Sequence, residues 1–552
     1  MNSTSSLQRN HTIDQMERQS FDLIVIGGGI TGAGIALDAA SRGMKVGLIE
    51  KEDFASGTSS RSTKLIHGGL RYLKQFEIAL VREVGRERAI VHELAPHLVL
   101  AEKMLLPLVE GGTFGKLATS FGLKVYDFLA GVEGDDQRVM LNKPETMQKE
   151  PLLKEEGLLG SGFYAEYRTD DARLTIELIK MAAQKQALSL NYVEATSFLY
   201  DDDQKVIGVR CRDLEGQRDF DMTSAYIVSA AGPWVDNLRK KDNSFEGKRL
   251  FLSKGVHLVV SRKRFPINHS VYFDVSDGRM IFAIPRQEIT YIGTTDTPYD
   301  GDINHVLTNS EDETYLLNAV NEMFPDIHLR SEDVISSWAG LRPLIYEEGK
   351  SASEMSRKDE IFESDTGLIS IAGGKLTGYR KMAQRIVDLV AERFEKTQGR
   401  SFQECHTDAI AFGGGPFQGS AGVNSYLEAL KMKIRESQLP EFYASYLVYN
   451  YGRQSDAILQ KMAQYSDAPE IALARAEVWF GVENELILRP LDFFSRRSGR
   501  LYFNIETIST VLDAVLDDLS DCFDWSVQKR QEEKELVQQH LHEAAHFEYS
   551  KT

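Results

Sequence analysis

The hydrophobic pattern near the start of the chain predicts a strand, a helix and a second strand. Residues 21–26, FDLIVI, form a short apolar run followed by glycines, which is typical of a strand buried on both faces of a parallel sheet. Apolar residues then recur at helical spacing up to Gly43, a residue type that commonly ends helices. Residues 44–50, MKVGLIE, supply the second strand. Together the three segments predict a βαβ unit.

The middle of the chain alternates between helical and strand-like patterns. DDARLTIELIKMAAQKQA predicts a helix from Asp171, and AYIVSAAG predicts a buried strand that ends at Gly232. MIFAIP and ITYIGTTD have the pattern of antiparallel strands, with a polar turn near Gln287 between them. GLISIAGGKLTGYRKMAQRIVDLVAERF predicts a strand, a glycine turn and a long amphipathic helix.

After about residue 400 the pattern becomes that of a helical domain. AFGGGPFQGS is typical of a linker or turn, and Leu, Ile, Tyr and Phe then recur at helical spacing as far as the charged segment QKRQEEKELVQQHLHEAAHF. A chain of 552 residues exceeds what one hydrophobic core usually organises, so we expect two or three domains.

Composition narrows the class of protein. A formal net charge of -18 argues against a protein that coats nucleic acid. The three cysteines are far apart, so they suggest neither a disulfide framework nor a metal site, and we expect no metal. The first twenty residues are polar and residues 21–40 carry five glycines, so we expect a cytosolic chain without a secretory signal or a membrane-spanning helix.

A dinucleotide fingerprint follows the first predicted strand. Gly27, Gly29 and Gly32 have the GxGxxG spacing, in which the glycines allow a tight turn, a close backbone approach to a pyrophosphate and close packing of helix on strand. Glu50 ends the second strand, where an acid accepts hydrogen bonds from a ribose diol and repels a 2′-phosphate. The fingerprint disfavours NADP and leaves FAD and NAD open.

A second glycine turn, IAGGKLTGYR, precedes the late helix and favours a flavin. A helix N-terminus directed at an isoalloxazine ring stabilises the negative charge that develops at N1 and O2 on reduction. A nicotinamide enzyme would instead need its own substrate domain with a proton-relay residue.

Seven segments together resemble the FAD-dependent glycerol-3-phosphate dehydrogenase family: the GxGxxG start with its Glu, SSRSTKLIHGGLRYL, DDARL, AAGPWVD, IGTTDTPYDGD, GLRPL and AGGKLTGYRKMA. The resemblance spans roughly residues 20–395 and continues into the helical tail. It implies an α/β fold plus helices: a Rossmann-type FAD-binding domain of the D-amino-acid-oxidase-like class, an antiparallel-sheet substrate domain and a helical C-terminal cap. On this basis we expect a polar tail over 1–20, an FAD-binding domain over 21–105, 160–240 and 335–395, a substrate domain over 106–159 and 241–334, and a helical domain over 400–552.

The resemblance also implies a reaction. It is the oxidation of sn-glycerol 3-phosphate to dihydroxyacetone phosphate by hydride transfer from C2 to flavin N5, with electrons passed to a membrane quinone. A small dianion calls for convergent Arg and Lys donors, and the candidates are Arg71 with Tyr72, Arg342 and Lys375. If these residues do not bind substrate, Arg71 forms a surface salt bridge and Arg342 holds the end of a strand in place. Arg342 and Lys375 are also candidates for stabilising a developing alkoxide.

Removal of the hydroxyl proton requires a base. His67, within the IHGGLRYL motif, is the first candidate because neighbouring cations would keep its imidazole neutral. His257 in KGVHLVV is the second. For each, an ordinary structural histidine is the alternative.

A polar segment after the second strand suits contacts to the cofactor, although a segment rich in Ser and Thr is also a common turn. The further cofactor-binding candidates are Thr58, Ser59, Ser60, Thr63, Lys64, Gly232, Gly374 and Thr377, and Arg380 is expected to contact the flavin or to support residues that do.

A quinone acceptor would bring the chain to the inner face of the cell membrane as a peripheral protein. The candidate contact segments are residues 104–131 and the basic residues 248–266, for which a buried helix and strand are the favoured alternative. A homodimer is left open. The alternative functions are a glycerol-3-phosphate oxidase that uses oxygen, a non-catalytic flavin-binding protein and an amine oxidase of the same fold.

Overall fold

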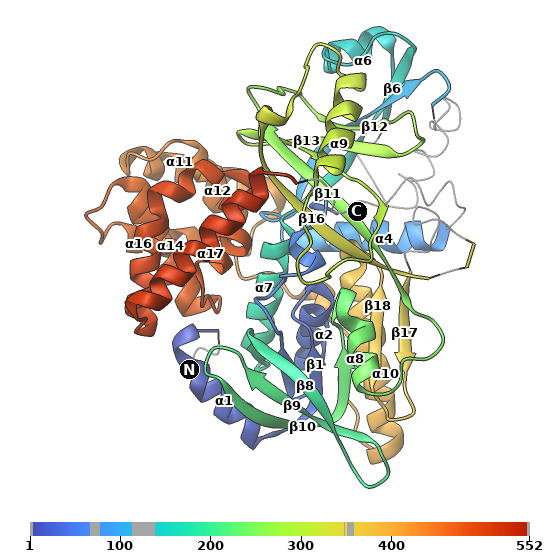
Figure 1. Cartoon of the computed structure of the whole chain (residues 1–552), viewed down its shortest axis with the longest axis vertical. Coiled ribbons are helices and arrows are strands. Elements are labelled where there is room, and N and C mark those ends of the chain that lie inside the picture. The colour runs from blue at the N-terminus through green and yellow to red at the C-terminus, as the bar shows by residue number, and fades with distance from the viewer. Residues whose placement is uncertain (1–3, 67–77, 113–137, 347, 350–357, 549–552) are drawn as a thin grey trace.

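The computed structural model describes residues 4–66, 78–112, 138–346, 348–349 and 358–548. Two large sheets lie one above the other, and the C-terminal helices lie beside them (Figure 1).

The first sheet has a parallel centre, as the βαβ pattern predicts. Its main strand order is β17-β18-β10-β1-β2-β7, and β9 pairs with β10 and β8 in antiparallel fashion. The parallel strands are β1 (Ser20–Ile26), β2 (Val46–Ile49), β7 (Leu188–Leu190), β10 (Arg218–Ser229) and β18 (Ile369–Gly373). The antiparallel strands are β8 (Val193–Tyr200), β9 (Val206–Asp213) and β17 (Asp359–Glu363).

Three helices supply most of the apolar surface that packs on this sheet: α2 (Ile30–Ser41), α7 (Asp171–Gln184) and α10 (Tyr379–Gln398). All three begin close to where the sequence pattern places them. Gly43 follows α2 with a φ of +95°, a conformation that suits glycine after a helix. The segment expected to be a polar tail instead contains helix α1 (Arg9–Arg18), because Ile13 and Met16 form an apolar face that is buried on the sheet side of the helix.

The second sheet is antiparallel apart from the pairing of β4 with β12. Its order is β15-β11-β14-β13-β12-β4-β6-β3, with β16 on β11 and β5 on β6. The strands are β3 (Leu65–Ile66), β4 (Leu100–Val109), β5 (Val139–Asn142), β6 (Leu158–Arg168), β11 (Leu250–Ser261), β12 (Ser270–Asp274), β13 (Met280–Arg286), β14 (Ile289–Gly293), β15 (Thr297–Pro298) and β16 (Val334–Ile345). Helices α6 (Lys143–Lys149) and α9 (Ser310–Met323) accompany it, and α4 (Ile78–Leu94) precedes β4.

The domain boundaries expected from the sequence differ from this arrangement. Strand β3 and most of strands β4, β6 and β16 lie in stretches assigned to the FAD-binding domain, yet all four belong to the second sheet. Local pattern identifies a strand, whereas its sheet is decided by the distant strand with which it pairs. The basic stretch 248–266, a candidate for membrane contact, contains the buried strand β11, which is the alternative favoured from the sequence.

The C-terminal region is helical, as expected. Its helices are α11 (Gly419–Glu436), α12 (Phe442–Tyr451), α13 (Ser455–Met462), α14 (Pro469–Asn484), α15 (Arg500–Phe503), α16 (Ile508–Phe523) and α17 (Val527–Ala545), with a π-helical segment over Asp492–Arg497. Within the described part of the chain, no helix combines the length and apolar character needed to cross a membrane.

Candidate active site

The first glycine turn joins β1 to α2 without room for side chains. Gly27 has a φ of +114°, and a Cβ there would lie 2.6 Å from the Ala230 carbonyl oxygen. A Cβ on Gly32 would lie 1.9 Å from the oxygen of Gly27. Gly29 is the N-cap of α2 and lines a cavity. The turn therefore presents backbone and a helix N-terminus to that cavity, the arrangement that binds phosphate groups.

Glu50 is bonded to this turn. Its Oε2 accepts a hydrogen bond of 2.7 Å from the Gly28 N–H, and its Oε1 accepts one of 3.0 Å from Glu52. Burial raises the pKa of Glu50 to about 7, against the opposing effect of these two N–H donors. Its carboxyl group thus fixes the Gly28 backbone, and Glu50 does not itself line the cavity.

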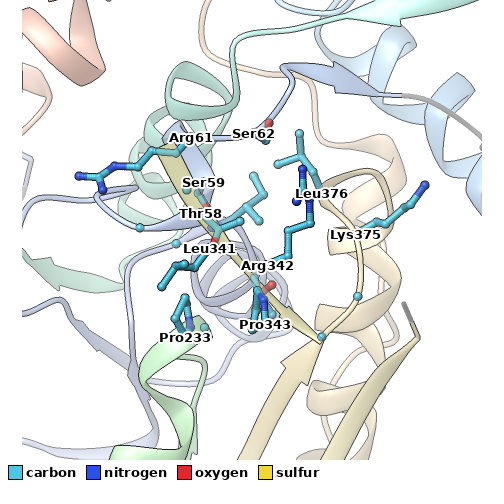
Figure 2. Close-up of a pocket in the computed structure, with 18 of the residues that line it drawn as sticks. Thr58, Ser59, Arg61, Ser62, Pro233, Leu341, Arg342, Pro343, Lys375 and Leu376 are labelled. Atoms are coloured by element: carbon cyan, nitrogen blue, oxygen red, sulfur yellow. The ribbon is translucent and has the colours of Figure 1, made fainter. Parts of the chain in front are cut away.

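The cavity brings together segments that are far apart in the sequence (Figure 2). It lies where the glycine turn, the loop after β2 and the second sheet meet. The predicted site residues on its wall are Gly29, Thr58, Ser59, Thr63, Gly232, His257, Arg342, Gly374, Lys375 and Thr377.

Arg342 projects from β16 and is held by the loop after β14. Its Nη2 donates to Thr294 Oγ1 at 2.8 Å, and its Nη1 donates to the Thr295 carbonyl at 3.1 Å and lies 3.4 Å from Asp296 Oδ1. The Arg342 side chain keeps 20% of its surface exposed. It is a fixed cation on the cavity wall, suited to bidentate recognition of an anion.

His257 lies on β11, where its ring stacks on Trp338 at a centroid distance of 4.8 Å. Its Nε2 lies 3.0 Å from Thr63 Oγ1. Burial, with the nearby charges of Arg342 and Lys64, holds the pKa of His257 well below its ordinary value. The imidazole is therefore neutral at pH 7.

The second glycine turn forms another part of the wall. Gly373 and Gly374 have φ values of +78° and +77°, and a 3₁₀ turn, Leu376–Gly378, leads into α10. Lys375 extends to the side away from Thr58 and Ser59 (Figure 2). Two helix N-termini, those of α2 and α10, therefore adjoin one cavity, although they are more than 300 residues apart in the sequence.

Comparison with known proteins agrees with this geometry. Residues 22–380 match the family model described as FAD dependent oxidoreductase, and residues 405–530 match the C-terminal domain of alpha-glycerophosphate oxidase. The aerobic glycerol-3-phosphate dehydrogenase of Bacillus subtilis is 50% identical over 546 residues, which cover 98% of each chain. The chain belongs to the FAD-dependent glycerol-3-phosphate dehydrogenase family. The dehydrogenase of the same name from Staphylococcus aureus is 49% identical over 98% of each chain.

A solved structure supports the family fold over the whole length. The glycerol-3-phosphate dehydrogenase of Bacillus halodurans, complexed with FAD, superposes with a TM-score of 0.84 at 44% identity, covering 98% of this chain and 99% of that one. Membership of the glycerol-3-phosphate dehydrogenase family confirms the D-amino-acid-oxidase-like fold expected from the motifs.

Lys64 and Ser60 do not line the cavity, which differs from their expected role as cofactor contacts. The Lys64 ammonium donates to Asp171 at 2.5 Å and to the Ser60 carbonyl at 3.0 Å. A buried ammonium requires an anionic partner, and Asp171 supplies it from the start of α7. Lys64 thus anchors the loop that carries Ser59 and Thr63.

The remaining expected residues divide into two groups. His67, Arg71 and Tyr72 lie outside the described residues. Arg380 forms a bidentate ion pair with Glu87 of α4, at 2.8 and 2.6 Å, and does not line the cavity. Arg380 thus ties the start of α10 to α4.

The partners of Arg342 and His257 were not predicted from the sequence. Asp296 and Thr294 hold Arg342, and Trp338 stacks on His257. Both arrangements depend on the pairing of β11 with β14 and β16, which no local pattern contains. The acid within IGTTD was the available signal for Asp296.

Proposed function

We propose that this chain binds FAD in the cavity and oxidises sn-glycerol 3-phosphate to dihydroxyacetone phosphate. The observation that carries the proposal is that one cavity joins a dinucleotide-binding glycine turn to a fixed arginine and a neutral buried histidine. The names of relatives at 49–50% identity over 98% of the chain support the same substrate.

The residues on the cavity wall fit FAD. The N-terminus of α2 and the backbone at Gly29 suit the pyrophosphate. Glu50 lies behind the turn, bonded to Gly28, and is the proposed partner of the adenosine ribose. Gly374, Thr377 and the start of α10 suit the flavin ring. When bound, FAD supplies the acceptor for the hydride that leaves C2 of the substrate, at flavin N5. The first sheet is thus the FAD-binding part and the second sheet the substrate-binding part.

The chain's own side chains bind the substrate and manage its proton. Arg342 binds the phosphate through its guanidinium, joined by Lys375 and, as the family resemblance implies, by Arg71 and Tyr72. His257 is the proposed acceptor of the hydroxyl proton, because it lines the cavity and is neutral before the reaction. His67 is the second candidate for this base.

The physiological electron acceptor in this proposal is a membrane quinone. The chain would then act in the cytoplasm as a peripheral protein on the inner face of the cell membrane. Production of hydrogen peroxide in step with turnover in air would instead identify an oxidase. Reduction by D-amino acids, in place of the phosphate ester, would identify an amine oxidase.

Anaerobic mixing of the purified flavoprotein with glycerol 3-phosphate tests the proposal. We expect the visible absorbance of the flavin to bleach and one dihydroxyacetone phosphate to form per flavin. A chain that binds FAD but is bleached neither by glycerol 3-phosphate nor by D-amino acids would be a non-catalytic flavin-binding protein. A chain purified without FAD and unable to take it up would overturn the cofactor assignment as well.

A further inference from the structure

A buried ion network joins the C-terminal helices to the segment that follows β2. Arg497 donates two hydrogen bonds of 2.8 Å to the two carboxylate oxygens of Asp53. The neighbouring Arg496 also donates to Asp53, and Asn191 donates to it at 3.0 Å. The side chains of Asp53 and Arg497 are 0% and 1% exposed. Residues more than 440 positions apart thus form a bidentate pair in the protein interior.

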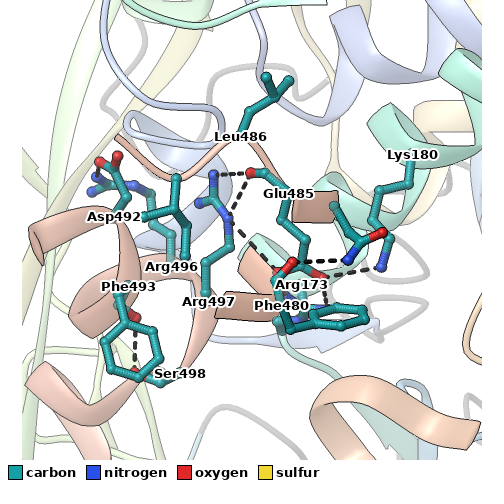
Figure 3. A network of polar contacts seen from close by, with 12 residues as sticks. Arg173, Lys180, Phe480, Glu485, Leu486, Asp492, Phe493, Arg496, Arg497 and Ser498 are labelled. Atoms are coloured by element: carbon teal, nitrogen blue, oxygen red, sulfur yellow. Dashed lines mark hydrogen bonds and ion pairs between the residues drawn. The ribbon is translucent and has the colours of Figure 1, made fainter. Parts of the chain in front are cut away.

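Arg497 is itself held in place by Glu485. Its Nη2 and Nε donate to the Glu485 carbonyl at 2.8 and 3.2 Å. The Glu485 carboxylate in turn accepts from Arg173 and Lys180 of α7 (Figure 3). Because α7 packs on the first sheet, Arg497 has a fixed position relative to that sheet.

The segment that Arg497 holds lies against the first glycine turn. Ala55 N–H donates to the Gly28 carbonyl at 3.0 Å. The Phe54 ring lies so near that a Cβ on Gly28 would be 2.5 Å from its Cδ1. Residues 53–55 therefore pack against the turn, and none of them is among the residues that line the cavity.

The negative charge on Asp53 strengthens its pairing with Arg497. Burial alone would raise the pKa of Asp53, but the charges of Arg497 and Arg496 outweigh it and bring the pKa to about 2. Asp53 is therefore ionised at pH 7. Loss of Arg497 would leave a buried carboxylate with an incomplete set of donors, and the segment would move to solvate it.

We propose that Arg497 is a positioning residue for FAD. By fixing Asp53 it holds residues 53–55 against Gly28, and it sets the affinity of the glycine turn for the cofactor although neither Arg497 nor Asp53 lines the cavity. The inference rests on the proposed function in one respect, that FAD binds at this turn. Through Arg497, the C-terminal domain contributes to the affinity of the cofactor site.

FAD release from the full-length holoenzyme tests the inference. The variants are Arg497→Met and Asp53→Asn, and the matched control is Arg500→Met, which breaks an equally buried pair with Glu477 inside the C-terminal domain. Serial dilution, followed by flavin fluorescence, gives the Kd for FAD. The same samples give the unfolding temperature from tryptophan fluorescence.

We expect Arg497→Met and Asp53→Asn each to raise the Kd for FAD at least about tenfold, and the double variant to raise it no further than the larger single effect, because both substitutions break the pair of Arg497 with Asp53. Arg500→Met should lower the unfolding temperature while leaving the Kd within about threefold of the wild-type value. If Arg497→Met does not fold, Arg497→Lys, which keeps the charge but loses the bidentate geometry, takes its place.

Equal Kd shifts in the Arg497 and Arg500 variants, or a wild-type Kd in Arg497→Met, would overturn the inference and leave the proposed function intact. A wild-type chain that does not bind FAD would overturn both.

Discussion

The guanidinium group of Arg342 lies over the backbone of Gly255 on the neighbouring strand. A Cβ at Gly255 would come within 2.2 Å of Arg342 Nη2 and 2.6 Å of its Cζ. Glycine at this position of β11 therefore lets the arginine of β16 lie flat on the cavity wall, where the loop containing Thr294 and Asp296 can hold it.

Replacement of Gly255 tests this relationship. Gly255→Ala should displace the guanidinium and raise the KM for glycerol 3-phosphate by about tenfold or more, since a hydrogen bond to a charged group is worth about 1.5–3 kcal/mol. FAD content should stay unchanged. Gly422→Ala in α11, where a Cβ meets only ordinary contacts from 3.6 Å, is the control. A normal KM in Gly255→Ala would remove Arg342 from substrate binding.

Glu50 offers a test of the cofactor site itself. Glu50→Gln replaces one of two acceptor oxygens with an amide that faces a backbone N–H donor, either Gly28 or Glu52. The turn should then distort, and we expect the Kd for FAD to rise by about tenfold or more. Fluorescence titration measures this change. An unchanged Kd would mean that the acid has no part in shaping the turn.

His257 should affect turnover more than binding. His257→Asn removes the proton acceptor but keeps a polar side chain, so kcat should fall by about 10²–10⁴ while KM changes by less than about threefold. His305→Asn, at an exposed loop position, is the control. Because the pKa of His257 lies well below 6.5, the acid limb of kcat/KM should lie below that pH as well. A variant with normal kcat would move the base to His67.

Local chemistry made the first glycine turn predictable. The clash of a Cβ on Gly32 with Gly27 is contained in the GxGxxG motif itself, so its spacing identifies the turn. The hydrogen bond from Gly28 to Glu50 was not predicted, because the motif led us to expect a ribose diol as the partner of Glu50. The GLRPL motif that contains Arg342 was recognised through the resemblance to the family, and the structure places Arg342 on the cavity wall.

The features that could not be predicted depend on contacts between residues far apart in the sequence. Lys64 lies in a segment rich in candidate cofactor contacts, but Asp171, 107 residues later, captures its side chain. Strands β6 and β16 have the apolar pattern of either sheet, and only their partners β4 and β11 place them in the second. The contact of Arg497 with Asp53 has no sequence signature at all.

His97 predicts a pH dependence of stability. It is fully buried, and neither ring nitrogen has a hydrogen-bond partner within the described ranges. Burial first, then the charges of Arg173 and Lys180, lower its pKa from 6.5 to about 3. Between these values the unfolded chain binds a proton that the folded chain does not, so the free energy of unfolding falls as the pH falls. From pH 7 to pH 5 the loss is about 2 kcal/mol.

His97→Gln should reduce that sensitivity, because glutamine does not titrate. The unfolding temperature of the wild-type chain should fall further between pH 7 and pH 5 than that of the variant, with all other titrating groups shared. Equal falls in the two proteins would show that His97 is protonated in the folded state as readily as in the unfolded state.

The most direct test of the account is the rate of anaerobic flavin reduction as a function of glycerol 3-phosphate concentration, in the wild-type chain and in Arg342→Lys. Lysine keeps the charge but loses the bidentate fork. We predict that the half-saturating concentration rises by about tenfold or more, that the limiting rate stays within about threefold, and that glycerol, which lacks the phosphate, reduces neither protein at a comparable concentration. Equal half-saturation in both proteins, or reduction by glycerol as readily as by its phosphate, would contradict the central claim that this cavity recognises a phosphorylated alcohol through Arg342.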